Sequence, residues 1–210
     1  MINGLLIKVC GITRACDAEA CVALGGVDFC GFVFHPPSPR NMTPQDVAHI
    51  RTGGGVRRVG VFTTHDTDEI LRTMEIARLD FAQLHAGQDE ACAEAIGAEC
   101  VIRVCFAVPA ATHRAAFLLF DKPFDWRTMK EEKLGMRNEE LGIGNGEGKP
   151  PRAVPQPYFI AGGLDARNIR EAVSCGAPSG VDLNSGVESA PGVKDVGKIK
   201  AVLEEIGRSF

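Results

Sequence analysis

Residues 158–188 read YFIAGGLDARNIREAVSCGAPSGVDLNSGVE and contain the clearest sign of the architecture. Two short apolar runs, 158–161 and 179–183, flank a segment with a helical pattern, and each run is followed by a turn that contains glycine. Strands that are almost wholly apolar and separated by helices are typical of a parallel sheet covered by those helices. The stretch therefore predicts a strand–helix–strand unit with two glycine turns at the same edge of the sheet.

Six further apolar runs continue this alternation along the chain. They predict strands at 5–10, 27–33, 57–62, 81–85, 100–106 and 115–121. Helical patterns predict helices at 15–24, 44–52, 66–78, 88–97, 165–175 and 194–206. Pro44 and Asp165 suit the first turns of their helices. Eight strands that alternate with helices predict a single (β/α)₈ TIM barrel over residues 1–210, at the short end of the usual size range.

Two connections depart from a regular barrel. Only residues 107–114 separate the fifth strand from the sixth, which is too short for a full helix, so we expect a turn or a single helical turn. Before the seventh strand, residues 127–157 are expected to form a polar insertion. Within it, 128–141 are compatible with a polar helix, and the glycines and prolines of 142–157 indicate a flexible loop.

Composition limits the partners of the chain. Of its 210 residues, 45% are hydrophobic and 24% are charged, and the formal net charge is −4. This balance argues against a binder of nucleic acid in general, so local groups must hold any anionic ligand. The eight cysteines show no CxxC spacing, the first ten residues lack the basic start of a leader, and no run is long enough to span a membrane. We therefore expect a reduced, cytoplasmic protein without a membrane partner.

The two glycine turns predict a phosphate site. In a barrel of this kind the active site lies at the C-terminal ends of the strands. Gly162 and Gly163 follow the seventh strand and open the next helix, while Ser185 and Gly186 follow the eighth strand. Glycines allow backbone N–H groups to approach an anion closely, and a helix N-terminus adds a favourable dipole. The alternative is that both segments are simply tight turns.

Two strand ends carry candidates for acid–base chemistry. Cys10 ends the first strand and Asp121 ends the sixth, across the mouth of the barrel. A thiolate in such a place can act as a general base, and a carboxyl group partly screened from water can act as a general acid. The alternatives are a buried structural cysteine and an aspartate that caps its own loop. Asp125 competes with Asp121 for the role of the acid.

Three other residues stand out by position. Arg40 lies in a loop stiffened by prolines over the barrel mouth, where a guanidinium suits a carboxylate that it grips with two parallel hydrogen bonds. The alternative is a solvated surface arginine. His85, at the end of the fourth strand, is expected to fill the top layer of the barrel rather than to touch a ligand. Arg103 is expected to point into the barrel and pair with an acid rather than to join the site.

Seven segments, in order over nearly the whole chain, resemble the phosphoribosylanthranilate isomerase family of tryptophan biosynthesis. They are KVCGIT (8–13), SPR (38–40), VGVF (59–62), QLH (83–85), FDW (124–126), IAGGL (160–164) with Asn168, and VDLNSGVESAPGVKD (181–195). The first and last of these segments are the most specific. The resemblance implies a (β/α)₈ barrel, in agreement with the fold predicted from the strand pattern.

The resemblance also implies an activity, without metal or organic cofactor. It is the Amadori rearrangement of N-(5-phosphoribosyl)anthranilate to 1-(2-carboxyphenylamino)-1-deoxyribulose 5-phosphate. Matching motif to motif, Cys10 is the implied base, Asp121 the implied acid and Arg40 the group that binds the anthranilate carboxylate. The backbone N–H groups implied to bind phosphate are those of Gly162, Gly163, Ser185 and Gly186, with Asp182 supporting that loop.

One departure from the family concerns the acid. Family members usually have a longer glycine-rich stretch before FDW, whereas only Lys122 and Pro123 separate Asp121 from Phe124 here. The role of the acid is therefore open to Asp125, and the 127–157 segment is a possible substitute for the missing loop.

Two other functions stay open at this stage. One is a pentose-phosphate epimerase that uses a metal, for which His35 and His85 are present but the accompanying acids are not. The other is a barrel that binds a phosphorylated ligand without catalysis. In each case the expected partner is a phosphorylated small molecule rather than nucleic acid, and the protein is expected to be a monomer or weak homodimer.

Overall fold

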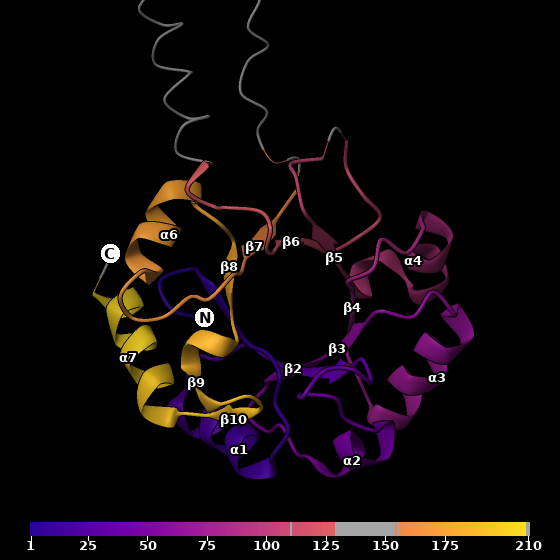
Figure 1. Cartoon of the computed structure of the whole chain (residues 1–210), viewed down its shortest axis with the longest axis horizontal. Coiled ribbons are helices and arrows are strands. Elements are labelled where there is room, and N and C mark those ends of the chain that lie inside the picture. The colour runs from indigo at the N-terminus through magenta and orange to yellow at the C-terminus, as the bar shows by residue number, and fades with distance from the viewer. Residues whose placement is uncertain (110, 129–153, 155, 209–210) are drawn as a thin grey trace, which may run out of the picture.

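Eight parallel strands close into a barrel with the strand order β1-β2-β3-β4-β5-β6-β7-β8 (Figure 1). This computed structural model describes residues 1–109, 111–128, 154 and 156–208. The strands are β1 (Leu6–Val9), β2 (Phe29–Phe34), β3 (Arg57–Phe62), β4 (Phe81–Leu84), β5 (Val101–Cys105), β6 (Phe117–Phe120), β7 (Tyr158–Ile160) and β8 (Gly180–Leu183). The predicted (β/α)₈ barrel is confirmed, and each strand lies within two residues of its predicted bounds.

Helices surround the barrel on its outer face (Figure 1). They are α1 (Ala15–Leu24), α2 (Pro44–His49), α3 (Thr67–Ala77), α4 (Glu90–Ile96), α6 (Ile169–Gly176) and α7 (Val196–Gly207), with short 3₁₀ helices η1 (Ala98–Cys100) and η2 (Ser185–Val187). The described part of 107–114 contains no helix, as predicted, while most of the predicted 127–157 insertion and 128–141 helix lies outside the described residues. None of the described helices has the length and apolar character needed to cross a bilayer.

The expected start of the helix after β7 is wrong. Asp165 does not open α6, which begins four residues later at Ile169. The side chain of Asp165 accepts a hydrogen bond from the backbone N–H of Arg167 at 2.8 Å, and Asn168 Oδ1 accepts one from the N–H of Asp165 at 2.9 Å. Aspartate and asparagine side chains that bond the nearby backbone favour turns over helix. These bonds hold residues 165–168 in a turn before the helix.

A second difference lies before the last helix. The last helix was predicted at 194–206, but α7 begins at Val196, and a small antiparallel hairpin of β9 (Glu188–Ala190) and β10 (Val193–Lys194) precedes it. The hairpin ends where the side chain of Asp195 caps α7 by accepting a hydrogen bond from the N–H of Lys198 at 3.1 Å. This hairpin was not predicted, and it carries two charged residues that matter for the site.

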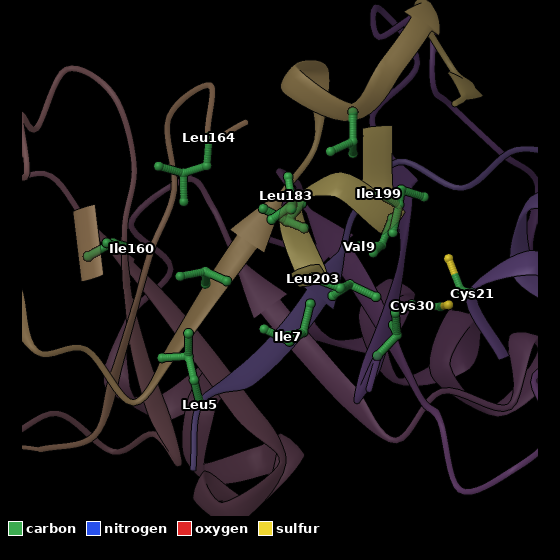
Figure 2. Packing of buried hydrophobic residues seen from close by; sticks show 14 of the residues in the cluster. Leu5, Ile7, Val9, Cys21, Cys30, Ile160, Leu164, Leu183, Ile199 and Leu203 are labelled. Atoms are coloured by element: carbon green, nitrogen blue, oxygen red, sulfur yellow. The ribbon is translucent and has the colours of Figure 1, made fainter. Parts of the chain in front are cut away.

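Side chains alternate strictly between the two faces of the strands. On β1, Ile7 and Val9 point outward and share a core cluster with Ile199 and Leu203 of α7 (Figure 2). Because successive strand residues face opposite sides, Lys8 points into the barrel. The same rule directs the polar residues at the strand ends toward the barrel mouth.

Aromatic rings fill the interior of the barrel at the N-terminal ends of the strands. Phe29 and Phe159 are fully buried and pack edge to face, with ring centres 5.7 Å apart. Phe81 and Phe117 complete this cluster. A Cβ at Gly180 would collide with the ring of Phe159, so this glycine is required for the packing. Because these rings fill the N-terminal end of the barrel, the space for a ligand lies at the C-terminal ends of the strands.

Candidate active site

A cavity of about 300 Å³ opens at the C-terminal ends of the strands. Every strand except β5 contributes to its wall, at the strand end or in the following loop. The polar residues and glycines that line it are Cys10, His35, Ser38, Arg40, Thr63, Gln83, His85, Asp121, Lys122, Gly162, Gly163, Asp182, Asn184 and Ser185. The cavity therefore brings together every predicted site residue except Gly186, which directly follows Ser185 in η2.

A buried ammonium group lies beside Cys10. Lys8 has no exposed surface, and its Nζ donates a hydrogen bond to Oδ2 of Asp182 at 2.8 Å. A Cβ at Gly31 would lie 2.8 Å from Sγ of Cys10 and 3.2 Å from Nζ of Lys8. The lack of a side chain at Gly31 therefore lets the sulfur and the ammonium group lie side by side. Sequence reasoning missed Lys8, although a lone charge inside an apolar strand was a signal.

The charges of these three groups depend on one another. Burial raises the pKa of the Cys10 thiol, and the positive charge of Lys8 opposes that rise. Burial also raises the pKa of Asp182, again against the effect of Lys8. Burial alone would lower the pKa of Lys8, but Asp182 and Cys10 raise it above its ordinary value. Lys8 is thus the neighbour that most favours a thiolate at Cys10.

Asp182 has one oxygen to offer a ligand. Its Oδ2 is occupied by Lys8, whereas its Oδ1 is buried and has no hydrogen-bond partner within the described part of the chain. A buried carboxylate oxygen without a partner is costly unless a ligand or water bonds it. Asp182 lines the cavity, so its unpaired oxygen is part of the candidate site.

Arg40 reaches the cavity from the loop after β2 and is held from behind by Glu188. Its Nε donates to Oε1 of Glu188 at 2.9 Å and its Nη2 donates to Oε2 at 2.6 Å. Lys194 Nζ donates to the same Oε1 at 2.7 Å and to Oδ1 of Asn184 at 3.0 Å. Gly11, at a φ of +74°, leaves room for the Arg40 side chain. We call Arg40, Glu188 and Lys194 the arginine cluster; its last two members were not predicted.

Only one member of the arginine cluster opens onto the cavity. The side chain of Arg40 is 19% exposed, against 4% for Glu188 and 0% for Lys194. Burial alone would raise the pKa of Glu188, but hydrogen bonds from Arg40 and Lys194 outweigh it and lower the pKa to about 2. Burial lowers the pKa of Lys194, and Glu188 opposes this effect. The ionised carboxylate is thus shared by two cations.

The two candidate acids lie in different hollows. Asp121 directly follows β6 and lines the same cavity as Cys10. One of its oxygens accepts a hydrogen bond from the backbone N–H of Lys122 at 2.8 Å. Asp125 lines a neighbouring hollow, has an exposed side chain and accepts a hydrogen bond from the backbone N–H of Arg127 at 3.0 Å. Of the two, only Asp121 lines the cavity that contains the thiol.

The glycine turns form the wall of the cavity beside β7 and β8. Gly162 and Gly163 adopt φ values of +106° and +75°, a region that favours glycine. A Cβ at Gly186 would collide with the carbonyl oxygen of Leu164, so the two turns pack closely. The expectation that the first turn opens a helix is wrong, because α6 begins only at Ile169. The turns can therefore offer an anion their own backbone N–H groups.

Two residues of the sequence analysis take unexpected places. His85 lines the cavity instead of only filling the top layer of the barrel. Arg103 does not point into the barrel, because it alternates with Ile102, which faces the interior. Its Nη1 donates to the carbonyl oxygen of Gln88 at 2.5 Å, and its Nη2 lies 3.5 Å from the carboxylate of Glu90. Arg103 thus pairs with an acid outside the site.

The two histidines of the metal-dependent alternative both lie at the barrel mouth. His35 and His85 both line the cavity, and Nδ1 of His35 lies 2.8 Å from the hydroxyl of Thr63. Among the residues that the structure describes, no three His, Cys, Asp or Glu side chains gather closely enough to hold a metal ion.

The chain is similar to known proteins over nearly its whole length. Residues 7–205 match the family model of N-(5′-phosphoribosyl)anthranilate (PRA) isomerase. The curated N-(5′-phosphoribosyl)anthranilate isomerase of Desulfovibrio desulfuricans is 44% identical, over 95% of this chain and 94% of the relative. That of Maridesulfovibrio salexigens is 38% identical, over 97% and 99%. The chain belongs to the N-(5′-phosphoribosyl)anthranilate isomerase family.

Solved structures agree with this membership. The phosphoribosyl anthranilate isomerase of Thermus thermophilus superposes with a TM-score of 0.76 at 33% identity, over 96% of this chain and 98% of that one. Another member, at a TM-score of 0.75 and 29% identity with the same coverage, was solved in complex with reduced 1-(o-carboxyphenylamino)-1-deoxyribulose 5-phosphate. The family predicted from the sequence is confirmed, and with it the prediction of an enzyme of the isomerase class.

Substitution of Glu188 by Gln tests the arginine cluster through its pH dependence. The pKa of Glu188 is lowered from 4.5 to about 2, so its ionised form stabilises the fold fully above pH 4.5 and loses this effect as the pH falls toward 2. We expect the wild type to be more stable than Glu188→Gln near neutral pH, by up to about 3 kcal/mol from this pKa difference. Denaturant unfolding at a series of pH values should show the two proteins converging below pH 4.5. A stability difference that stays constant from about pH 6 to about pH 3 would contradict the ionised cluster.

Proposed function

We propose that the protein catalyses the Amadori rearrangement of N-(5′-phosphoribosyl)anthranilate to 1-(2-carboxyphenylamino)-1-deoxyribulose 5-phosphate, in tryptophan biosynthesis. The observation that carries the proposal is one cavity that holds a thiol, a carboxyl group, a cation and two glycine turns. The family membership supports the same reaction, as does the relative solved with a reduced analogue of the product. No residue is assigned to a metal or organic cofactor.

The first half of the reaction opens the sugar ring. Asp121, protonated, donates its proton to the ring oxygen, and the bond between C1 and that oxygen breaks. The nitrogen of the anthranilate group supplies its lone pair, so C1 becomes part of a protonated imine. A positioned acid is worth about 10²–10⁴ in rate. Asp121 suits this role because it lines the cavity shared with Cys10.

The second half moves a proton between carbon atoms. The Cys10 thiolate removes the proton from C2, and the electron pair of that bond neutralises the imine to give an enol with an amine at C1. The enol then tautomerises to the ketone, which places a proton on C1 and removes one from the hydroxyl on C2. Asp121 has given one proton to the ring oxygen and Cys10 has taken another from C2, so a proton must pass from Cys10 to Asp121 before the next turnover. Lys8 favours the thiolate that this step needs.

The two ends of the substrate are both anionic, and the cavity offers a place for each. We assign the anthranilate carboxylate to Arg40 and the phosphate to backbone N–H groups of the two turns, at Gly162–Gly163 and Ser185–Gly186. We also assign to Asp182 a hydrogen bond from a sugar hydroxyl, accepted by the Oδ1 that has no partner among the described residues. Held at both ends, C2 would lie between the sulfur and the carboxyl group.

Replacement of Cys10 tests the base. We expect Cys10→Ala to lower kcat by at least about a hundredfold, because the variant has no group to take the proton from C2. The change in anthranilate fluorescence on turnover gives the rate, and titration with the reduced product analogue gives the affinity, which should change little. Cys16→Ala, on an exposed cysteine, is the matched control. Full activity in Cys10→Ala would eliminate the assignment of the base.

A parallel pair of variants tests the acid. Asp121→Asn and Asp125→Asn make the same chemical change four residues apart, in different hollows. We expect only Asp121→Asn to lower kcat, by about 10²–10⁴, since an amide has no proton of suitable acidity to donate. If Asp125→Asn loses activity while Asp121→Asn keeps it, the acid is Asp125 instead.

The oligomeric state and the localisation of the protein follow from the sequence analysis alone. The predicted monomer or weak homodimer stays a prediction, as does the cytoplasmic localisation. The phosphorylated small molecule is the partner that the cavity supports best, since its anionic ends match the cation and the turns.

A further inference from the structure

Two cations of the arginine cluster share one carboxylate. Glu188 accepts hydrogen bonds from Nε and Nη2 of Arg40 at 2.9 and 2.6 Å, and from Nζ of Lys194 at 2.7 Å. With the carboxylate ionised and both cations protonated, the cluster keeps one unit of positive charge. Without Lys194, the negative charge of Glu188 would cancel the positive charge of Arg40, and the pair would have no net charge.

The position of Glu188 decides which edge of the guanidinium is free. Nε and Nη2 point to Glu188, so Nη1 and the second hydrogen of Nη2 lie on the outer edge of Arg40. Two parallel hydrogen bonds from such an edge match the two oxygens of a carboxylate. Because Lys194 and Glu188 are buried and Arg40 alone lines the cavity, the remaining positive charge is presented through this edge.

We propose that Lys194 is a positioning residue for recognition of the aryl carboxylate: it takes a share of Glu188, and so keeps the charge of Arg40 available to the ligand. The inference rests on the proposed function, which supplies the carboxylate. Lys194 does not line the cavity, so it acts through Arg40 and Glu188. Its second hydrogen bond, to Oδ1 of Asn184 at 3.0 Å, connects the cluster to the turn at Ser185.

A neighbouring lysine offers a matched control. Lys198, on α7, donates its Nζ hydrogen bond to the backbone carbonyl oxygen of Glu188 at 2.6 Å, and it does not contact the carboxylate. Its side chain is exposed, so solvent screens its charge. Lys198→Met therefore removes a nearby cation without changing how the Glu188 carboxylate is shared.

The experiment compares two ligands on the full-length protein. One is the reduced product analogue, and the other is the same molecule without its carboxyl group. Calorimetry gives both dissociation constants. The dissociation constant of the analogue without the carboxyl group, divided by that of the analogue with it, reports what the carboxylate contributes to binding. We expect Lys194→Met to lower this ratio by at least about tenfold, and Lys198→Met to leave it unchanged. In Lys194→Met, KM should rise by a larger factor than kcat falls, because Lys194 acts on the carboxylate through Arg40, whereas its charge favours the Cys10 thiolate less than that of Lys8 does.

A charge-restoring variant separates electrostatics from packing. The double variant Lys194→Met/Glu188→Gln lacks both the ammonium and the carboxylate, so Arg40 again carries one unit of net charge. The amide oxygen of the introduced glutamine would still accept a hydrogen bond from the guanidinium. We expect the ratio to return toward the wild-type value in the double variant. Binding of the analogue without the carboxyl group serves as the test of folding, and Lys194→Gln replaces Lys194→Met if the latter fails it.

The outcomes have distinct meanings. An unchanged ratio in a folded Lys194 variant overturns the inference, and so does a lowered ratio that the double variant fails to restore. If the wild type binds neither analogue, the proposed function fails and the inference fails with it. If the wild type binds both analogues and only the Lys194 variants lose the carboxylate contribution, the inference holds.

Discussion

The seam between β1 and β8 is the constraint on which the site depends. There the barrel closes in a register that pairs Lys8 with Asp182, and the two side chains meet inside at 2.8 Å. Removing one partner of a buried ion pair typically costs about 3–5 kcal/mol, so a different register at the seam is strongly disfavoured. The same register places Cys10, two residues beyond Lys8, beside the turn that follows Asp182. The ion pair between Lys8 and Asp182 therefore favours the register in which β1 pairs with β8, and with it the position of Cys10 beside the turn after β8.

Two clusters of buried charged side chains lie beside the cavity. The first, Lys8 with Asp182, lies beside Cys10, and the charge of Lys8 opposes the rise that burial causes in the pKa of the thiol. The second, the arginine cluster, lies at the side and presents a cation to the ligand. The β9–β10 hairpin supplies Glu188 and Lys194 to the second group, so an element outside the barrel completes it. The formal net charge of the chain is −4, so the positive charge that faces the cavity is local.

The sequence predicted the barrel and part of the cavity wall, because both follow from short-range patterns. Apolar runs gave the strands, and the rule that active sites lie at the C-terminal strand ends selected Cys10, Asp121 and the glycine turns. The short-range sequence pattern could not show which residues a side chain bonds when those residues lie far away in the sequence. Arg40 was correctly placed at the barrel mouth, but its bidentate pair with Glu188 joins residues 148 positions apart. Lys8 and Lys194 were missed for the same reason, since their roles arise only when distant segments meet.

The errors in local structure also have physical causes. Asp165 has the residue type of a helix start, yet its side chain and that of Asn168 bond the backbone of a turn instead. Arg103 was expected inside the barrel, whereas the two-residue repeat of β5 turns it outward toward Glu90. In both cases a specific contact overrode a general preference. Neither error moved a residue that the proposed mechanism uses.

The central claim is spatial: the thiol of Cys10 and the carboxyl group of Asp121 flank the same carbon atom of a ligand held at its two anionic ends. A crystal structure with the reduced product analogue tests it most directly. We expect the phosphate against Gly162–Gly163 and Ser185–Gly186, the carboxylate on the outer edge of Arg40, and C2 between the sulfur and the carboxyl group. A ligand bound in the opposite direction, or one whose C2 lies out of reach of Cys10, would contradict it.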